Sequence, residues 1–216
     1  MTGRTQKKTK REIILDAAEA LFAVHGFDGV SMRMIAERGP VGLGLLTHHF
    51  PAKDQLFAAV LERRADIINT ARLAALDALD KPDLEALLAA FLRPYVERIA
   101  EGDEGWRSYA RLHAMMTQDA RWTPVAAAIF GGVAEEMIAR IQVVEPRLTP
   151  DLAARGYVLL LGGMVSMFAD TRLLDRLTHG RLSSSDVVAS FDPIVRFAAA
   201  GIRALAEPAG TDPHAA

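Results

Sequence analysis

Residues 11–62 read REIILDAAEALFAVHGFDGVSMRMIAERGPVGLGLLTHHFPAKDQLFAAVLE, and this stretch decides the fold. Its apolar residues recur every three to four positions, which is the period of an α-helix. Gly26 is suited to end a first helix, and Ser31 is a good N-cap for a second. Gly39-Pro40 ends the second helix, because the residue before a proline is disfavoured in the α conformation. We therefore expect three short helices followed by a long one, over residues 9–25, 32–38, 42–49 and 54–79.

Three short helices with a brief turn between the second and the third form a helix-turn-helix arrangement. Apolar residues from the second and third helices can close a small core with the first helix: Ile35, Val41, Leu46 and Phe50. The outward residues of the third helix are then free to enter the major groove of DNA, which is wide enough to admit a helix. By their spacing these outward residues are Leu43, Gly44, Thr47 and His48.

The same stretch closely resembles the DNA-binding domain of the tetracycline-repressor (TetR) family. The matching positions, all in one register, are Ile14, Ala17, Ala18, Leu21, Phe22, Gly26, Phe27, Ser31, Ile35, Ala36, Val41, Gly44, Leu46, His49, Phe50, Lys53, Leu56 and Phe57. The resemblance implies that Arg33 contacts a base or a phosphate and that Lys53 contacts a phosphate. His49 is interpreted as a packing or phosphate-contact residue. Lys10, in the basic N-terminal arm, would add affinity that does not depend on the DNA sequence.

The chain departs from the family pattern in the third helix, called the recognition helix because it would enter the groove, and in the turn before it. Pro40 stands where a turn glycine is usual, and Thr47 replaces a phosphate-contacting tyrosine. Gly42 and Leu43 stand where polar residues are common. Two glycines in so short a helix cost about 1 kcal/mol each relative to alanine. We therefore expect an intrinsically weak recognition helix that orders fully only on DNA, which hydrogen exchange of residues 42–49 with and without operator would test.

Composition limits the remaining possibilities. The chain has no cysteine, which excludes a disulfide scaffold, a thiolate metal site and a cysteine nucleophile. Its net charge is −2, yet residues 1–64 carry ten Lys and Arg against seven Asp and Glu. The first ten residues lack the apolar region of a secretory signal. The longest near-apolar run, residues 157–169, falls short of the ~20 residues of a membrane span. These features predict a cytoplasmic, nucleoid-associated protein without a membrane partner.

Neither metal chemistry nor catalysis is expected. His48 and His49 point about 100° apart on a helix and lack a third ligand nearby. Residues 65–206 contain none of the sequence signatures of metalloproteases, serine hydrolases or β-lactamases. We therefore predict that the protein is not an enzyme and needs no cofactor.

Helices rich in methionine and aromatic residues follow the N-terminal stretch. Such residues at helical spacing usually pack in a core, but the TetR resemblance implies a ligand cavity in this region. Methionine adapts to varied apolar shapes, and a pocket needs only a few polar groups. For a small hydrophobic effector, the candidate ligand-binding residues are Trp106, Tyr109, His113, Met116, Phe130, Met137, Met164, Phe168 and Arg172.

The last two long helices, expected over residues 150–177 and 183–206, offer a dimer interface. Residues 157–165 are apolar around the whole helix, so they must be buried on more than one side. Paired across a two-fold axis, the two helices would form a four-helix interface, as in the TetR family. The two helix-turn-helix domains of such a dimer (residues 11–58 of each chain, called heads below) would lie about one helical turn (~34 Å) apart. They would then read a near-palindrome. Alternatively, both helices complete the core of a monomer.

The sequence thus predicts an all-α protein of about nine helices and no strand. Its expected parts are a basic N-terminal arm, a helix-turn-helix domain, a ligand-binding and dimerisation domain and a disordered tail, over residues 1–10, 11–58, 59–206 and 207–216. The predicted function is that of a ligand-responsive, DNA-binding homodimer, a repressor that a small apolar effector releases from its operator. Two alternatives remain: a helical small-molecule-binding protein or unrecognised enzyme, and an interaction module whose N-terminal helices hold a protein partner.

Overall fold

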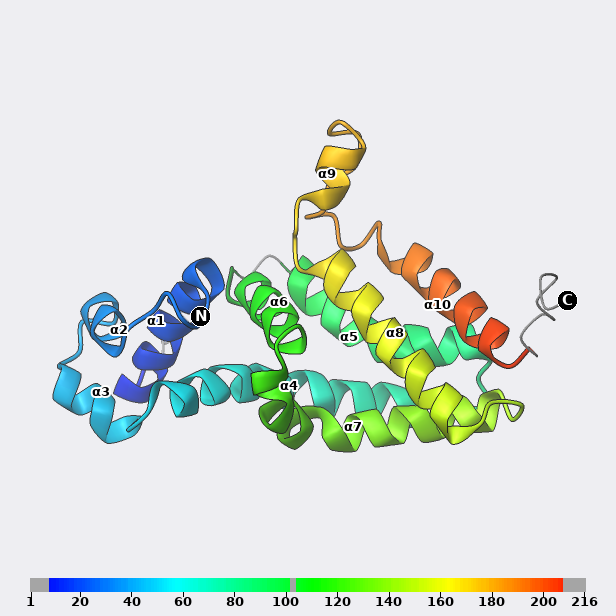
Figure 1. Cartoon of the computed structure of the whole chain (residues 1–216), viewed down its shortest axis with the longest axis horizontal. Helices are drawn as coiled ribbons and strands as arrows, with labels where there is room; N and C mark the ends of the chain where they lie inside the picture. Colours follow the sequence, from blue (N-terminus) through cyan, green and yellow to red (C-terminus); the bar gives the residue numbers. More distant parts are fainter. Residues whose placement is uncertain (1–7, 102–103, 208–216) are drawn as a thin grey trace, which may run out of the picture. The chain divides into compact units, whose positions relative to one another are not determined.

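A computed structural model describes residues 8–101 and 104–207. Within these residues the chain is all-α, with no strand (Figure 1). Its elements are α1 (Lys10–His25), α2 (Met32–Arg38), α3 (Leu43–His49), α4 (Lys53–Asp77), α5 (Leu84–Ala100), α6 (Glu104–Thr117), a 3₁₀ turn η1 (Ala120–Trp122), α7 (Thr123–Val144), α8 (Pro150–Phe168), α9 (Leu173–Leu177) and α10 (Phe191–Leu205). The predicted fold class is confirmed, with one more helix than expected.

Local signals set the ends of the first three helices. Thr9 caps α1, and it forms a capping box with Glu12, whose carboxylate accepts from the backbone N–H of Thr9. The hydroxyl of Ser31 accepts from the backbone N–H of Met34, so α2 begins where the sequence predicts. Helix α3 begins one residue later than predicted, with Gly42 as its N-cap.

A small core holds α1, α2 and α3 together. Ile35, Leu46 and Phe50 are buried as predicted, and Val41 is half-buried. Gly39 is needed for close approach rather than for an unusual φ angle. A Cβ at this position would lie only 3.3 Å from the Cβ of Ala17 on α1. Glycine therefore lets the end of α2 pack directly against α1.

The chain divides into two compact units, and the first comprises residues 8–67 and 104–129 of the described chain. It includes α6, which packs against α1. These contacts group the residues differently from the predicted boundary between residues 58 and 59. Most of the predicted basic arm (1–10) and nearly all of the predicted tail (207–216) lie outside the described residues.

In the second unit, residues 68–101 and 130–207 of the described chain, α5, α8 and α10 pack on one another. Figure 1 shows α9 projecting away from these three helices. Within the described chain, α8 is the one helix long and apolar enough to suit a membrane span. Core helices of water-soluble proteins pass the same test, and α8 packs against both α5 and α10.

Two predicted helix boundaries near the C-terminus were wrong. The helix expected over residues 150–177 is broken after Phe168, because Asp170 and Arg172 adopt φ angles of 50° and 61°. Helix α10 begins at Phe191 rather than at residue 183, which places Pro193 in its first turn, where a missing N–H costs no hydrogen bond. Helix α7 begins at Thr123, directly after η1.

Candidate functional site

The outer face of α3 carries the predicted base-reading residues. Leu43, Gly44, Thr47 and His48 are all exposed, whereas Leu46 between them is fully buried. The hydroxyl of Thr47 lies 3.1 Å from the carbonyl oxygens of Leu43 and Gly44, so it donates within its own helix. At this position the chain therefore lacks a hydroxyl donor that points freely at a phosphate.

Exposed cations accompany this face. Arg33, on α2, forms an exposed ion pair with Glu37 (3.1 Å), and such pairs contribute little to stability in water. Arg33 can therefore leave Glu37 for a base or a phosphate at small cost. Lys10 is exposed at the start of α1, next to Arg11. The Arg11 guanidinium lies 5.3 Å from the ring centre of Phe50, the residue that caps α3. The prediction had not singled out Arg11 as a site residue, because only this tertiary contact places it beside α3.

Lys53 has an anchoring role that the sequence did not predict. Its ammonium donates to the carbonyl oxygens of Phe27 and Val30, both at 2.9 Å, and lies 4.1 Å from the ring centre of Phe27. An ammonium has three N–H donors, so at most one remains for the predicted phosphate contact. Lys53 thus fixes the loop between α1 and α2 whether or not it touches DNA. His49 is exposed, with its ring 5.8 Å from that of His48.

The loop between α1 and α2 also contacts η1. The ring centre of Trp122 lies 4.7 Å from that of Phe27 in this loop and 4.4 Å from that of Phe57 on α4. Arg121 donates to both carboxylate oxygens of Asp28, at 3.0 and 3.1 Å. This hydrogen bonding lowers the pKa of Asp28 despite slight opposition from desolvation. The contact joins residues far apart in the chain, which is why the sequence pattern gave no sign of it.

We expect Asp28→Asn to make the first unit less stable at pH 7. A carboxyl whose pKa is lower in the folded state stabilises that state above its unfolded pKa, about 4 for aspartate. The stabilisation disappears as the pH falls through the lower, folded-state pKa. The variant and the unaltered protein should therefore converge in stability at strongly acid pH. Urea unfolding at pH 7 and at pH 3 measures this, and a constant difference would contradict it.

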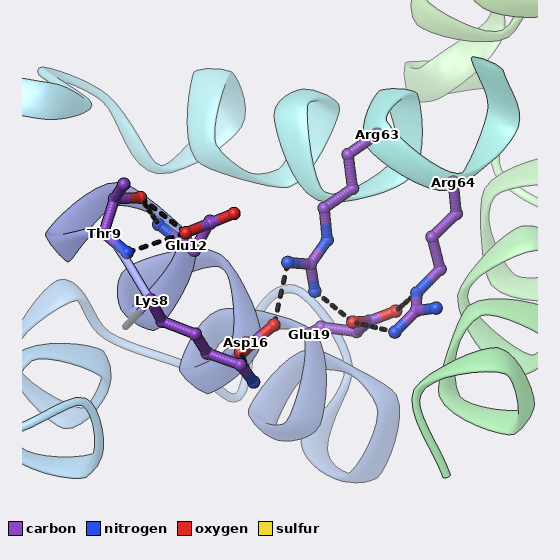
Figure 2. Close-up of polar contacts among 7 residues, drawn as sticks. All are labelled: Lys8, Thr9, Glu12, Asp16, Glu19, Arg63 and Arg64. Carbon is purple, nitrogen blue, oxygen red and sulfur yellow. Dashed lines mark hydrogen bonds and ion pairs between the residues drawn. The ribbon is translucent and has the colours of Figure 1, made fainter. Parts of the chain in front are cut away.

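Figure 2 shows a polar cluster that ties α1 to α4. The Glu19 carboxylate is almost completely buried and pairs with Arg63 and with Arg64, whose Nε lies 2.5 Å from it. Arg63 also bonds Asp16 at 2.8 Å, and Lys8 bonds Asp16 at 2.7 Å. Partial burial opposes ionisation of Asp16, but the hydrogen bonds from Lys8 and Arg63 lower its pKa overall. The cluster holds the part of α4 that belongs to the first unit against α1.

The predicted ligand-binding residues fall into two groups. Four lie on the buried side of α6, in the first unit: Trp106, Tyr109, His113 and Met116. The Tyr109 ring lies 5.8 Å from that of Trp106 and 5.9 Å from that of His113. The other five lie in the second unit: Phe130, Met137, Met164, Phe168 and Arg172.

Within the second unit, Met164 lies beside an arginine that the prediction missed, and the ring of Phe168 lies 6.3 Å from that of Tyr95. Arg72 is fully buried, donates to the carbonyl oxygen of Phe91 at 3.1 Å and lies 3.4 Å from the sulfur of Met164. Its guanidinium also stacks 4.1 Å from the ring centre of Phe91. Ile68, four residues before, and Leu76, four after, are both core residues. That spacing is a signal that Arg72 occupies a core position.

The other predicted ligand residues of this unit are placed differently. Met137 is buried and Phe130 is half-buried. Arg172 is exposed, with its guanidinium 3.4 Å from Asp170 and 3.5 Å from Asp175. This position, just before α9, does not support a role as a polar group inside a pocket. Among the residues that the structure describes, no group of three or more His, Asp or Glu could hold a metal ion.

An apolar groove of about 180 Å³ runs between α8 and α10. Its lining includes Leu159, Gly163, Phe197, Ala198 and Gly201. Phe197 is 78% exposed, and Leu159 is also largely exposed. Both helices thus present large apolar side chains at the surface.

These features define a helix-turn-helix protein with a further bundle of helices. The tetR family model of bacterial regulatory proteins matches residues 14–60, and the tetracyclin repressor-like C-terminal domain matches residues 89–201. The chain therefore belongs to the TetR family of bacterial regulatory proteins.

Individual relatives agree with this assignment. The HTH-type transcriptional repressor KstR of Rhodococcus jostii (strain RHA1) is 39% identical over 64 residues, which is 30% of each chain. The regulator RutR of Escherichia coli (strain K12) is 30% identical over 155 residues, 71% of this chain and 60% of RutR. The chain thus spans less than a third of the first of these curated relatives.

Solved structures share the fold at low sequence identity. The fatty acid degradation regulator FadR from Bacillus halodurans has a TM-score of 0.66 at 14% identity, covering 92% of this chain and 99% of that one. The multidrug binding protein EbrR, solved with malachite green, has a TM-score of 0.58 at 23% identity, covering 88% and 98%.

Proposed function

We propose that this chain is a ligand-responsive transcriptional repressor that binds a near-palindromic DNA operator as a homodimer. The exposed outer face of α3, accompanied by Arg33, Lys10 and Arg11, is the observation that carries the proposal. A relative with a similar N-terminal region, KstR, is named a transcriptional repressor. In this proposal residues 11–58 bind DNA and residues 59–206 bind the effector and dimerise. The protein works in the cytoplasm, on the nucleoid, without catalysis.

The groove between α8 and α10 supports dimerisation through these two helices. Water-soluble monomers seldom expose contiguous apolar surface of this kind, which instead marks interaction sites. A second copy of the chain would cover it across a two-fold axis, since such an interface uses the same surface twice. Two heads then address two half-sites of one operator.

The effector proposal rests on buried aromatic and methionine side chains that each unit contains within itself: Trp106, Tyr109 and Met116 in the first, and Met137, Met164 and Phe168 in the second. EbrR, which shares this fold, is described as multidrug binding, and malachite green is a largely aromatic ligand. A small apolar effector would favour a state whose heads do not fit the operator. Because coupling is reciprocal, operator DNA must then weaken effector binding by the same factor. Equal effector affinity with and without operator would refute this mechanism.

The first test is fluorescence anisotropy of labelled DNA from upstream of the protein's own gene, with random-sequence competitor. We expect binding at least ~1,000-fold tighter than to random DNA. If the protein makes six to ten phosphate contacts, raising the salt concentration from 50 to 200 mM should reduce its affinity for DNA by a factor of roughly 10³–10⁵. If neither this fragment nor any fragment selected from the whole genome binds more tightly than random DNA, the proposal is wrong.

A further inference from the structure

The first turn of α3 presents an apolar surface, whereas Thr47 and His48, the other two residues expected to contact bases, are polar. Leu43 and Leu45, on either side of Gly44, are 46% and 38% exposed. The first turn of the helix, residues 43–46, contains no side chain that can form a hydrogen bond. Leu46 and Phe50, at 0% and 5% exposed, close the core, whereas Leu43 and Leu45 each leave a large part of the side chain at the surface.

Gly44 is likewise not required by the chain itself. A Cβ at this position would meet nothing within 4 Å, and its φ angle is not in the left-handed region. Glycine nevertheless weakens a helix relative to alanine. Neither packing within the chain nor the φ angle requires a glycine at this position. A glycine of this kind, between two exposed leucines, is typical of a backbone that must approach a partner closely.

The partner must therefore present apolar groups between negative charges. Arg33, Lys10 and Arg11 are exposed cations of the same head. The major groove of DNA has this combination: phosphates form its edges, and the C5-methyl group of each thymine projects into it. A guanine–cytosine pair has no methyl group in the major groove, so it would offer Leu43 and Leu45 no apolar contact of this kind.

Resting on the proposed function, we propose that α3 recognises its operator mainly through thymine methyl groups. Leu43 and Leu45 contact these methyl groups, and Gly44 allows the helix backbone to lie close to them. Arg33 and the cations at the start of α1 fix the position of the head on the phosphates. The operator half-site is then rich in thymine at the positions under α3, and the methyl group, rather than a hydrogen bond, distinguishes the correct base.

Replacing thymine by deoxyuridine tests this directly, because uracil pairs as thymine does but lacks the methyl group. In an operator identified by anisotropy, a symmetric pair of substitutions under α3 should weaken binding about 10-fold, as expected for two methyl groups returned to water. The same substitution outside the half-sites should change affinity less than about 2-fold. Equal affinity for the thymine and deoxyuridine operators throughout the half-sites would overturn the inference.

Protein variants connect the effect to the two leucines. Leu43→Ala and Leu45→Ala should bind the thymine operator more weakly and should lose much of the discrimination against deoxyuridine. Discrimination that survives in both variants would assign methyl recognition to other residues and contradict the proposal. If the unaltered protein binds no operator specifically, the proposed function itself is wrong, which is a different result from binding that ignores the methyl groups.

Gly44→Ala should change two measured quantities in opposite directions: it should raise the thermal stability and lower the affinity for the operator. The substitution should raise Tm by about 2–4 °C, because alanine is the better helix former and has room for its Cβ. Operator affinity should nevertheless fall at least ~10-fold, because the methyl group holds the helix away from the groove. Gly132→Ala, at an exposed position of α7 with equal space, is the matched control and should leave affinity unchanged. Full affinity of Gly44→Ala would contradict the close approach.

Discussion

Glu19→Ala should destabilise the first unit by about 3 kcal/mol, the loss expected when one partner of a buried ion pair is removed. The side chain of Glu19 is only 4% exposed, and its carboxylate compensates the charges of Arg63 and Arg64, which are themselves mostly buried. Removing the carboxylate leaves two guanidinium groups close together in a poorly solvated place. Arg63 keeps Asp16 as a partner, at 2.8 Å, which limits the loss.

Tryptophan fluorescence during urea unfolding measures this effect selectively. Both tryptophans of the chain, Trp106 and Trp122, lie in the first unit, so their signal follows its unfolding. A loss of about 3 kcal/mol also corresponds to a fall in Tm of roughly 6–12 °C for a protein of this size.

Two further variants separate charge from packing. Glu37→Ala removes a glutamate of the same head whose ion pair with Arg33 is exposed, and it should change stability by less than about 0.5 kcal/mol. The double variant Glu19→Leu/Arg64→Met replaces buried charges by apolar side chains and should recover much of the loss. If Glu19→Ala is as stable as Glu37→Ala, the buried cluster does not hold α1 to α4 as argued.

The sequence predicted the head well because its helix ends depend on neighbouring residues. Ser31 and Gly39-Pro40 define α2 locally, and the structure places both of its ends where expected. The break between α8 and α9 could not be predicted in this way. Apolar residues recur at intervals after Phe168, at Ala169, Leu173, Leu174 and Leu177, and the positive φ angles belong to Asp170 and Arg172, which are not glycines.

The candidate site was likewise predictable where local sequence determines it and not where distant residues meet. The exposed residues of α3 follow from helical spacing, and the resemblance to the TetR family supplies their roles. The contact of Arg121 with Asp28 joins residues 93 positions apart, so no local pattern indicates it. The three serines at 183–185 were misleading, because they resemble a helix start while α10 begins only at Phe191.

Phe197→Glu should dissociate the proposed homodimer and, with it, abolish tight operator binding. Phe197 lines the groove between α8 and α10, and 78% of it is exposed in the single chain. Burying a phenylalanine contributes roughly 1.5–3 kcal/mol, and a two-fold interface buries two. The dimer should therefore weaken by roughly 3–6 kcal/mol, which is about 10²–10⁴-fold in its dissociation constant. Two glutamates facing each other across the axis would add to this loss.

Sedimentation velocity at micromolar concentration should show a dimer for the unaltered protein and a monomer for Phe197→Glu. The operator affinity of the variant should fall at least ~100-fold, because a single head makes only half of the contacts. Val143→Glu is the matched control: Val143 is 80% exposed on α7, does not line the groove, and should leave the dimer and operator binding unchanged. A Phe197→Glu protein that remains dimeric would show that the two copies meet through another surface. A monomer that still binds its operator tightly would show that one head is sufficient for recognition.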